Sequence, residues 1–448
     1  MKNLDFSVSC RYLALVGPVA ISSQLDNLVG FAEIFMVRSL GSAAISAVGI
    51  SRQFVMVVGI TMVAVTTGTM TMVAQAIGAK DHQNASTTTK QSITLVFAVS
   101  ALISLIGYLG SSTAMRLMSL PYEVIVLGLP YLKWFFISLP LMGVHYTITT
   151  CLHASGDARS PLYIAVVSNV VRLIAGYGFI FGVWSLPELG VKGAAVGGLV
   201  GSGLGVGVSI LALYSGRCGL TLSPEGSYLP EWDRARRILR IGIPSAIQGL
   251  FRNGSNLVFI KLVALTAKST TALAAFAIGN QMERVLRRTS LAFGTATTSL
   301  VGHSLGAREV DQAEKRAWTT LTLSVTGMIA LGIPIALLGE YYMSIFSSDP
   351  AVLVVGIVYL WAIAAAEPFL CGAIVGDGAL RAAGDTMPPL YYTLIAQWLV
   401  RLPAAYILAF PLGYGVNGIW IALVIFSAAQ AILTIRKLAR GDWKSRRI

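Results

Sequence analysis

The amino-acid sequence repeats itself at one fixed separation. LHASGDARSPLY at 152–163 returns as LRAAGDTMPPLY at 380–391, 228 residues later (380 minus 152), with seven positions identical in register. The same offset relates Gly78 to Gly306. One offset that links several distant segments indicates a duplication. The chain is therefore predicted to be two copies of one unit of roughly 215 to 225 residues.

The composition places this repeat in a membrane. The 448 residues are 55% hydrophobic and 12% charged, whereas soluble proteins carry about 25% charged residues. The apolar runs are long enough to cross a hydrocarbon core of about 30 Å. Only helices and closed barrels satisfy the backbone in lipid, and the runs are too long for barrel strands. An all-α membrane protein is therefore predicted.

Twelve transmembrane helices are predicted, six in each repeat. They lie near 11–37, 46–76, 92–117, 125–151, 160–185, 190–215, 239–266, 271–301, 317–341, 351–379, 389–412 and 415–435. The predicted domains are an N-terminal six-helix lobe (1–215), a cytoplasmic linker (216–238), a C-terminal six-helix lobe (239–435) and a basic cytoplasmic tail (436–448). An even number of spans makes the repeats parallel, related by a pseudo-two-fold axis along the membrane normal.

Basic residues predict the orientation. They crowd the connections after the even-numbered spans, as in RARRILR at 234–240, and the C-terminal tail. By the positive-inside rule, both termini and the central linker are predicted to be cytoplasmic, in the cell inner membrane. The same rule accounts for the net charge of +13, so no nucleic-acid partner is expected. The first apolar segment lacks the features of a cleavable signal peptide.

The repeated GD loops lie at the predicted cytoplasmic ends of spans. Gly156 and Gly384 allow tight turns, and Asp157 and Asp385 can accept hydrogen bonds from backbone amides. The prolines that follow can start the next helix. We expect structural connectors at these places rather than substrate contacts.

Several motifs resemble one transporter family. LRAAGDTMPP at 380–389, LVGHSLGAREVDQAEKRA at 300–317 with its echo at 72–85, and ELGVKGAA at 188–195 are similar to the multidrug and toxic compound extrusion (MATE) transporters. The resemblance covers nearly the whole chain. It implies efflux of small organic molecules, driven by an inward gradient of H⁺ or Na⁺, through alternating access of two lobes around a cavity.

Acidic residues inside the spans are candidates for ion coupling, because an ionisable group in a membrane is costly. Asp26 and Glu33 lie two helical turns apart, on one side of the first span. Glu33 occupies the place where the first helix of the MATE family usually has Asp, and Asn27 could help to hold Na⁺. Glu283 and Glu367 are the candidates in the second repeat. A carboxyl group in a low-dielectric cavity also binds its proton more tightly.

Static ion pairs are the alternative for each of these acids. Glu283 precedes Arg287 by four residues, a spacing that favours an ion pair on one helix. Glu367 has Arg401 as a possible partner.

Basic residues inside the spans are the unusual feature. Arg172, Arg252 and Arg401 fall mid-span, and Lys261 lies farther out. MATE transporters commonly have an Asn and an acid near Arg172, and an acid near Arg252. Surplus arginine favours carboxylate or phosphate groups, which guanidinium pairs bidentately. These residues, with Tyr177, therefore predict either contacts to an anionic or zwitterionic substrate, such as an organic acid or siderophore-like metabolite, or pairing with the acids of the spans.

Several chemistries find no support in the sequence. There is no GxxxxGK[ST] loop, no nucleophile elbow and no cluster of metal-ligand spacing. We therefore expect no enzyme activity, no metal and no cofactor apart from the coupling ion. The predicted function is a MATE-type antiporter, a monomer whose partners are a small-molecule substrate and membrane lipid. The alternatives are a flippase for a lipid-linked anionic precursor and, more distantly, a membrane enzyme.

Overall fold

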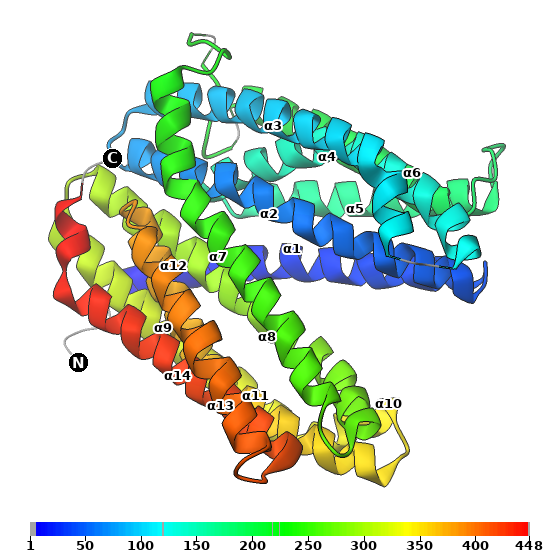
Figure 1. Cartoon of the computed structure of the whole chain (residues 1–448). Helices are drawn as coiled ribbons and strands as arrows, with labels where there is room; N and C mark the ends of the chain where they lie inside the picture. Colours follow the sequence, from blue (N-terminus) through cyan, green and yellow to red (C-terminus); the bar gives the residue numbers. More distant parts are fainter. Residues whose placement is uncertain (1–5, 119–120, 217, 224, 447–448) are drawn as a thin grey trace. The chain divides into compact units, whose positions relative to one another are not determined.

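The computed structural model describes the whole chain except residues 1–5, 119–120, 217, 224 and 447–448 (Figure 1). Within the described part, helices and short connections make up the structure, without a strand. The all-α prediction is therefore confirmed.

Helices of the first half begin and end near the limits that the apolar runs predict, except that α3 begins ten residues before the predicted 92 (92 minus 82). They are α1 (Phe6–Arg38), α2 (Ser42–Gly78), α3 (His82–Leu117), α4 (Tyr122–Ala154), α5 (Arg159–Phe181) and α6 (Val191–Tyr214). In this half α4 packs against α2, α3 and α6, and α5 packs against α6.

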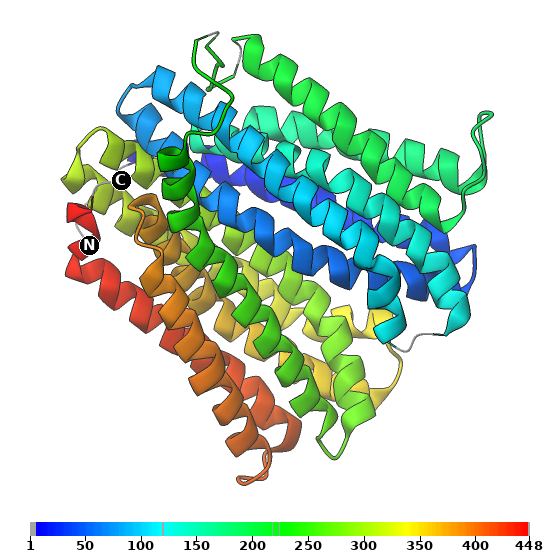
Figure 2. The same ribbon diagram turned by 45° about the horizontal axis from the view of Figure 1, so that its top comes forward.

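The second half repeats the pattern with more interruptions. Its elements are α7 (Trp232–Ala264), α8 (Ser269–Gly306), α9 (Val310–Leu337), α10 (Gly339–Phe346), α11 (Pro350–Ala382), α12 (Met387–Leu394), the π-helix η1 (Ile395–Arg401), α13 (Leu402–Ala409), α14 (Gly415–Arg440) and the 3-10 helix η2 (Asp442–Ser445). The twelve predicted spans correspond to α1 to α9, α11, the continuous segment α12–η1–α13, and α14. Figure 2 shows that segment (orange) beside α14 (red), against which it packs.

Nine of these segments are long and apolar enough to cross a membrane, counting only the described residues. The other three long helices, α1, α7 and α8, carry charged side chains in their middle portions. A multi-pass membrane protein follows from the nine alone.

Contacts divide the chain into two units. The N-terminal unit is Gly17–Ile243, and the C-terminal unit combines the start of α1, up to Val16, with Pro244–Ile448. Tyr12 explains the assignment of the start of α1: its hydroxyl donates to the Phe293 carbonyl (3.1 Å) and lies 2.6 Å from Ser324 Oγ. Both α1 and α7 thus contribute to both units, and each unit is described below by itself.

The backbone repeats at the same offset as the sequence. Lys80 and Arg308, 228 residues apart, both have a φ of +60°. In the GD loops, Gly156 and Gly384 also have positive φ, which glycine adopts without strain. The Asp157 and Asp385 amides each donate to the carbonyl five residues earlier, at 3.1 and 2.9 Å. The duplication therefore extends to the conformation of individual turns.

The two GD aspartates differ in their partners. Asp157 accepts from the amides of Arg159 (3.1 Å) and Ser160 (3.0 Å), as predicted. The side chain of Asp385 is fully buried and instead faces Arg446 Nη1 at 3.2 Å and Lys437 Nζ at 3.8 Å. The amide-acceptor prediction is therefore wrong for Asp385, whose charge is matched by basic residues of the C-terminus.

The C-terminal segment is folded rather than a free basic tail. Helix α14 continues to Arg440, and η2 follows at once. Trp443 is fully buried, packs in a cluster with Val301, Ala317 and Leu380, and donates from Nε1 to the Leu438 carbonyl at 3.0 Å. The indole thus closes one end of the C-terminal unit.

A buried lysine holds the linker between α6 and α7. Lys90 of α3 is 1% exposed, and its ammonium donates to the carbonyls of Ser223 (2.6 Å), Glu225 (3.0 Å) and Gly226 (3.3 Å). It also lies 5.1 Å from the centre of the Tyr228 ring. Charge-assisted hydrogen bonds to three carbonyls fasten the linker to the N-terminal unit.

We expect Lys90→Met to release this linker, because it leaves three carbonyls without their donor. Hydrogen exchange of the backbone amides in 218–231 is expected to become at least about tenfold faster. The matched control is Lys80→Met, which removes the same charge from an exposed side chain. Equal exchange rates in the two variants would show that the linker is held by other contacts.

Candidate functional site

Glu33 of α1 is the centre of a charged cluster in the N-terminal unit. Its side chain is 5% exposed and accepts two hydrogen bonds from Arg172 of α5, from Nε at 2.5 Å and from Nη2 at 2.9 Å. Arg52 of α2 donates to the same carboxylate at 3.1 Å. One carboxylate therefore joins three helices and is shared by two guanidinium groups. Arg172 belongs to an ion pair, one of the two predicted alternatives.

Close packing of α6 on α5 helps to position Arg172. A side chain at Gly201 would stand 2.7 Å from Arg172 Cβ, closer than real contacts allow. Because Gly201 has no side chain, α6 can pack directly against Cβ of Arg172. This packing leaves the guanidinium group directed toward Glu33.

Asp26 lies two turns from Glu33 on α1 and also faces α5. Asn169 Nδ2 donates to Asp26 Oδ1 at 2.9 Å, and Asn169 is 8% exposed. The two acids therefore share one side of α1, as the spacing predicts. Asn27 donates instead to Gln24 within α1, at 3.2 Å. The sequence analysis missed Asn169, although it precedes Arg172 by one helical turn.

In the C-terminal unit, Glu283 of α8 forms the ion pair with Arg287 that its spacing predicts. Tyr359 of α11 donates to the other carboxylate oxygen at 2.6 Å. The tyrosine is fully buried, and its ring centre lies 4.3 Å from that of Trp420. Glu283 is therefore neutralised by Arg287 and held by a packed phenol that the sequence did not point to.

Glu367 of α11 has a different environment. It is 3% exposed, and its Oε2 lacks a hydrogen-bond partner among the described residues. The charged groups that act on it are Arg287 and Glu283. Within the described chain no ion pair joins Glu367 to Arg401, so the predicted alternative of that pair is wrong.

Arg401 is buried by uncharged partners. It ends the π-helix η1, one residue before Leu402 and two before Pro403, which lacks an amide hydrogen. Its Nη1 donates to Asn256 Oδ1 (2.6 Å) and Gln397 Oε1 (2.9 Å). The guanidinium carbon lies 4.0 Å from the centre of the Phe259 ring and 4.9 Å from that of Phe426. Amide oxygens and aromatic faces thus stabilise its charge.

The remaining predicted site residues are Arg252, Lys261 and Tyr177. Arg252 of α7 is half-buried and forms no hydrogen bond or ion pair with a described residue. Lys261 is exposed on the same helix. Tyr177 is 45% exposed and packs against Phe181 and Trp184, with ring centres 4.9 and 6.2 Å away. Arg252 and Lys261 belong to the C-terminal unit, and Tyr177 belongs to the N-terminal unit.

Asp377 of α11 is a buried acid that the sequence analysis missed. It is 2% exposed and accepts from Gln248 Nε2 (3.1 Å) and Thr434 Oγ1 (3.3 Å). Gln248 also lies 2.7 Å from Thr393 Oγ1, so α7, α11, α12 and α14 meet at this network. The rule that an acid within a span is a candidate would have found it. Among the described residues, no group of three or more His, Cys, Asp or Glu could hold a metal ion.

Comparisons with known proteins agree with the fold. The MatE family model matches residues 18–177 and 244–407. A protein of Thermotoga maritima named Probable multidrug resistance protein NorM is 26% identical over 439 residues, covering 97% of this chain and 93% of that protein. A protein of Shewanella oneidensis named FAD transporter is 25% identical, with 94% and 93% covered.

A solved structure has the same fold. A MOP superfamily transporter from Pyrococcus furiosus superposes with a TM-score of 0.88 at 19% sequence identity, covering 98% of this chain and 96% of its own. That protein is described as having a binding pocket of reverse polarity, which suggests a different function. The twelve-helix, two-repeat fold class is thereby confirmed.

Proposed function

This chain belongs to the MatE family of transporters, and we propose that it is a secondary active antiporter that exports small organic anions in exchange for H⁺ or Na⁺. Its relatives are named as multidrug resistance proteins and transporters, so it is a transporter and not an enzyme. The proposed movement is alternating access of the two six-helix lobes. The family match favours an exporter over a flippase for a lipid-linked precursor.

The coupling role is proposed for Glu367 and Asp26. Glu33 and Glu283 are each engaged in an ion pair with arginine, so these two carboxylates already have partners. The environment of Glu367 carries the proposal. Its carboxyl group is buried without an ion pair in the described part of the chain, and Oε2 lacks a hydrogen-bond partner there, so this oxygen can accept a proton or a cation. Asp26 has an uncharged amide as its hydrogen-bond donor, which likewise leaves room for an exchanged ion.

Arginines of the C-terminal unit support an anionic substrate. Arg252 and Arg401 lie in the spans, and neither has a carboxylate at ion-pair distance among the described residues. Guanidinium groups without a counterion favour carboxylate and phosphate groups. The relative named FAD transporter and the relative with a pocket of reverse polarity are consistent with such a substrate.

Basic connections support the proposed placement of the chain. Arg234, Arg236, Arg237 and Arg240 gather at the start of α7, and further basic residues follow α14. We place these ends and both termini at the cytoplasmic face of the inner membrane by the positive-inside rule. We propose a monomer without a cofactor other than the coupling ion.

Transport into proteoliposomes tests the proposal. With an imposed proton or sodium gradient, the purified protein is expected to accumulate FAD or another organic anion, and not a lipophilic cation such as ethidium. Glu367→Gln is expected to lower gradient-driven accumulation by at least about tenfold, because the side chain can no longer exchange an ion. The matched control is Glu340→Gln, at an exposed acid of α10.

The possible results test the substrate, the coupling residues and the flippase alternative separately. Accumulation of the cation without the anion would remove the substrate assignment and leave the antiport intact. Unchanged gradient dependence in both Glu367→Gln and Asp26→Asn would contradict the coupling assignment. Transfer of a lipid-linked anion between leaflets, without export of soluble anions, would support the flippase instead.

A further inference from the structure

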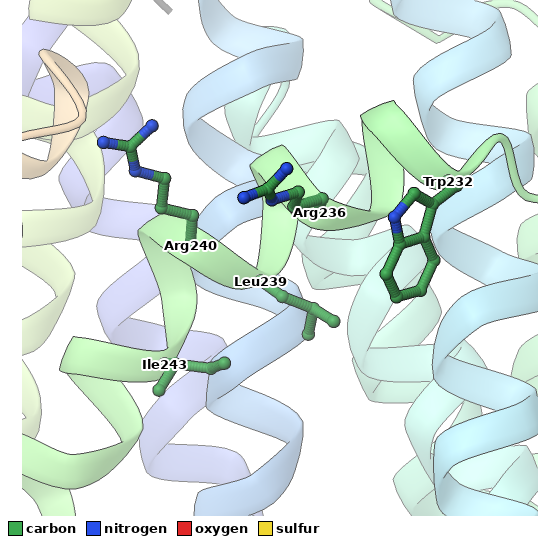
Figure 3. Close-up of a pocket in the computed structure, with 5 residues that line it drawn as sticks. All are labelled: Trp232, Arg236, Leu239, Arg240 and Ile243. Atoms are coloured by element: carbon green, nitrogen blue, oxygen red, sulfur yellow. The ribbon is translucent and has the colours of Figure 1, made fainter.

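The start of α7 has two unlike faces. Ala235, Ile238 and Gly242 are buried, and a side chain at Gly242 would collide with the α2 backbone at Ala64. The opposite face lines a surface cavity of about 610 Å³ (Figure 3), and its lining residues are Trp232, Arg236, Leu239, Arg240 and Ile243. All of them belong to the N-terminal unit.

The cavity combines two positive charges with apolar lining residues. Figure 3 shows the guanidinium groups of Arg236 and Arg240 on neighbouring turns of one helix. Both side chains are exposed, and neither forms a hydrogen bond or ion pair with another described residue. Leu239, between the two arginines in the sequence, and Ile243, after them, supply apolar lining. Two arginines four residues apart on a helix are about 6 Å apart at Cβ and can bind one phosphate together.

Trp232 indicates where this face lies relative to the boundary between water and lipid. It is 77% exposed at the first residue of α7. An exposed indole is typical of the boundary between water and lipid, where one part of the ring is apolar and another can donate a hydrogen bond. From Trp232 to Ile243 the face therefore begins with an amphipathic indole, continues with two arginines that have Leu239 between them, and ends with the apolar Ile243.

That order matches an anionic phospholipid in the cytoplasmic leaflet. A headgroup phosphate is the complement of two guanidinium groups that form no ion pair within the described part of the chain, and acyl chains are the complement of Leu239 and Ile243. A nucleic acid or an acidic peptide would leave the apolar part without a partner. We propose that this face of α7 binds one anionic phospholipid, with its phosphate between Arg236 and Arg240.

This inference goes beyond transport. It depends on the proposed function only for the side of the membrane on which the face lies. A lipid at this place would fix the start of α7, the helix that passes from one unit to the other.

Native mass spectrometry of the full-length protein tests the site. The protein is equilibrated with phosphatidylglycerol or with phosphatidylcholine of the same acyl chains, and the retained lipid is counted. Wild type is expected to retain phosphatidylglycerol preferentially, and R236Q/R240Q is expected to retain about tenfold less. R236K/R240K is expected to lie between them, because it keeps the charge and loses the bidentate geometry.

A double variant of equal charge provides the matched control. R159Q/R237Q removes two exposed arginines from the same end of the N-terminal unit. Arg237 lies on α7 itself. Arg159 lies two residues after Asp157, which accepts a hydrogen bond from the Gly219 amide of the linker at 3.3 Å. It is expected to retain phosphatidylglycerol as wild type does. An equal loss in both double variants would overturn the proposal in favour of diffuse charge attraction, and so would a wild type without preference for the anionic lipid.

A third variant distinguishes a lipid site from a site for free phosphate. It also provides a test that does not depend on changing the arginines. Ile243→Asn keeps both charges at a position that is 46% exposed, and it is expected to lower retention about threefold through lost apolar contact. Inorganic phosphate at millimolar concentration is expected not to displace the lipid. Displacement by phosphate, together with unchanged retention in Ile243→Asn, would show an anion site rather than a lipid site.

Discussion

Gly242→Ala is expected to prevent the N-terminal unit from folding correctly. A Cβ atom at this position would stand 1.6 Å from the carbonyl oxygen of Ala64 on α2. One turn away the contact is reciprocal, because a Cβ at Gly68 would stand 2.1 Å from the carbonyl oxygen of Ile238 on α7. Backbone atoms cannot move aside as a flexible side chain can. Small residues of this kind let membrane helices approach closely.

The expected loss of stability is about 3 kcal/mol or more, which exceeds what overpacked cores usually cost. Size-exclusion chromatography and thermal unfolding of the detergent-purified protein measure it. Gly207→Ala is the control, since no atom lies within 4 Å of the added Cβ and alanine favours a helix over glycine. Unfolding temperatures of Gly242→Ala at or above those of Gly207→Ala would contradict the close approach of α2 and α7.

Glu33→Gln is expected to be the most damaging single change of charge. It would leave Arg172 and Arg52 beside each other without the carboxylate that they share. Removal of one partner from a buried ion pair costs about 3 to 5 kcal/mol. Because both arginine side chains are about 30% exposed, we expect the lower end of that range. Thermal unfolding in detergent measures the change.

The double variant tells whether this pairing is static. Glu33→Gln with Arg172→Gln removes one charge of each sign, so part of the stability is expected to return. Arg52→Gln alone is expected to have a small effect, because Glu33 keeps its bidentate contact with Arg172. Strictly additive losses in the double variant would show that the two groups do not interact in the protein. Gradient-driven transport by the double variant would support a structural role for Glu33.

Contacts between residues of one helix could be predicted from the sequence, whereas contacts between residues of different helices could not. The Glu283–Arg287 pair follows from a spacing of four residues on one helix, which brings the side chains together wherever that helix lies. Arg401 is the contrary case. Its charge alone suggested Glu367, whereas the structure gives it Asn256, Gln397 and two aromatic rings. Which side chains surround a buried guanidinium depends on the rotation and depth of neighbouring helices.

The C-terminus shows the same limit. Its composition predicts only a basic cytoplasmic tail, because lysines and arginines outnumber the apolar residues. One tryptophan and one buried aspartate, far apart in the sequence, change that outcome: Trp443 enters an apolar cluster, and Arg446 meets Asp385. The burial of one large side chain can fix a segment in which most residues are charged and exposed. Composition does not show this, because it counts all residues of the segment alike.

The sequence by itself determined the membrane environment, the duplicated helices and the turns at the repeated GD motifs. Apolar length and glycine conformation act within a few residues of the chain, so they can be read without neighbours. Only the tertiary structure decided which charges are paired. Within the described part of the chain it leaves Oε2 of Glu367 without a hydrogen-bond partner, and it exposes Arg236 and Arg240 without an ion pair. Ion pairs form across helices, and their partners are set by packing that no local pattern records.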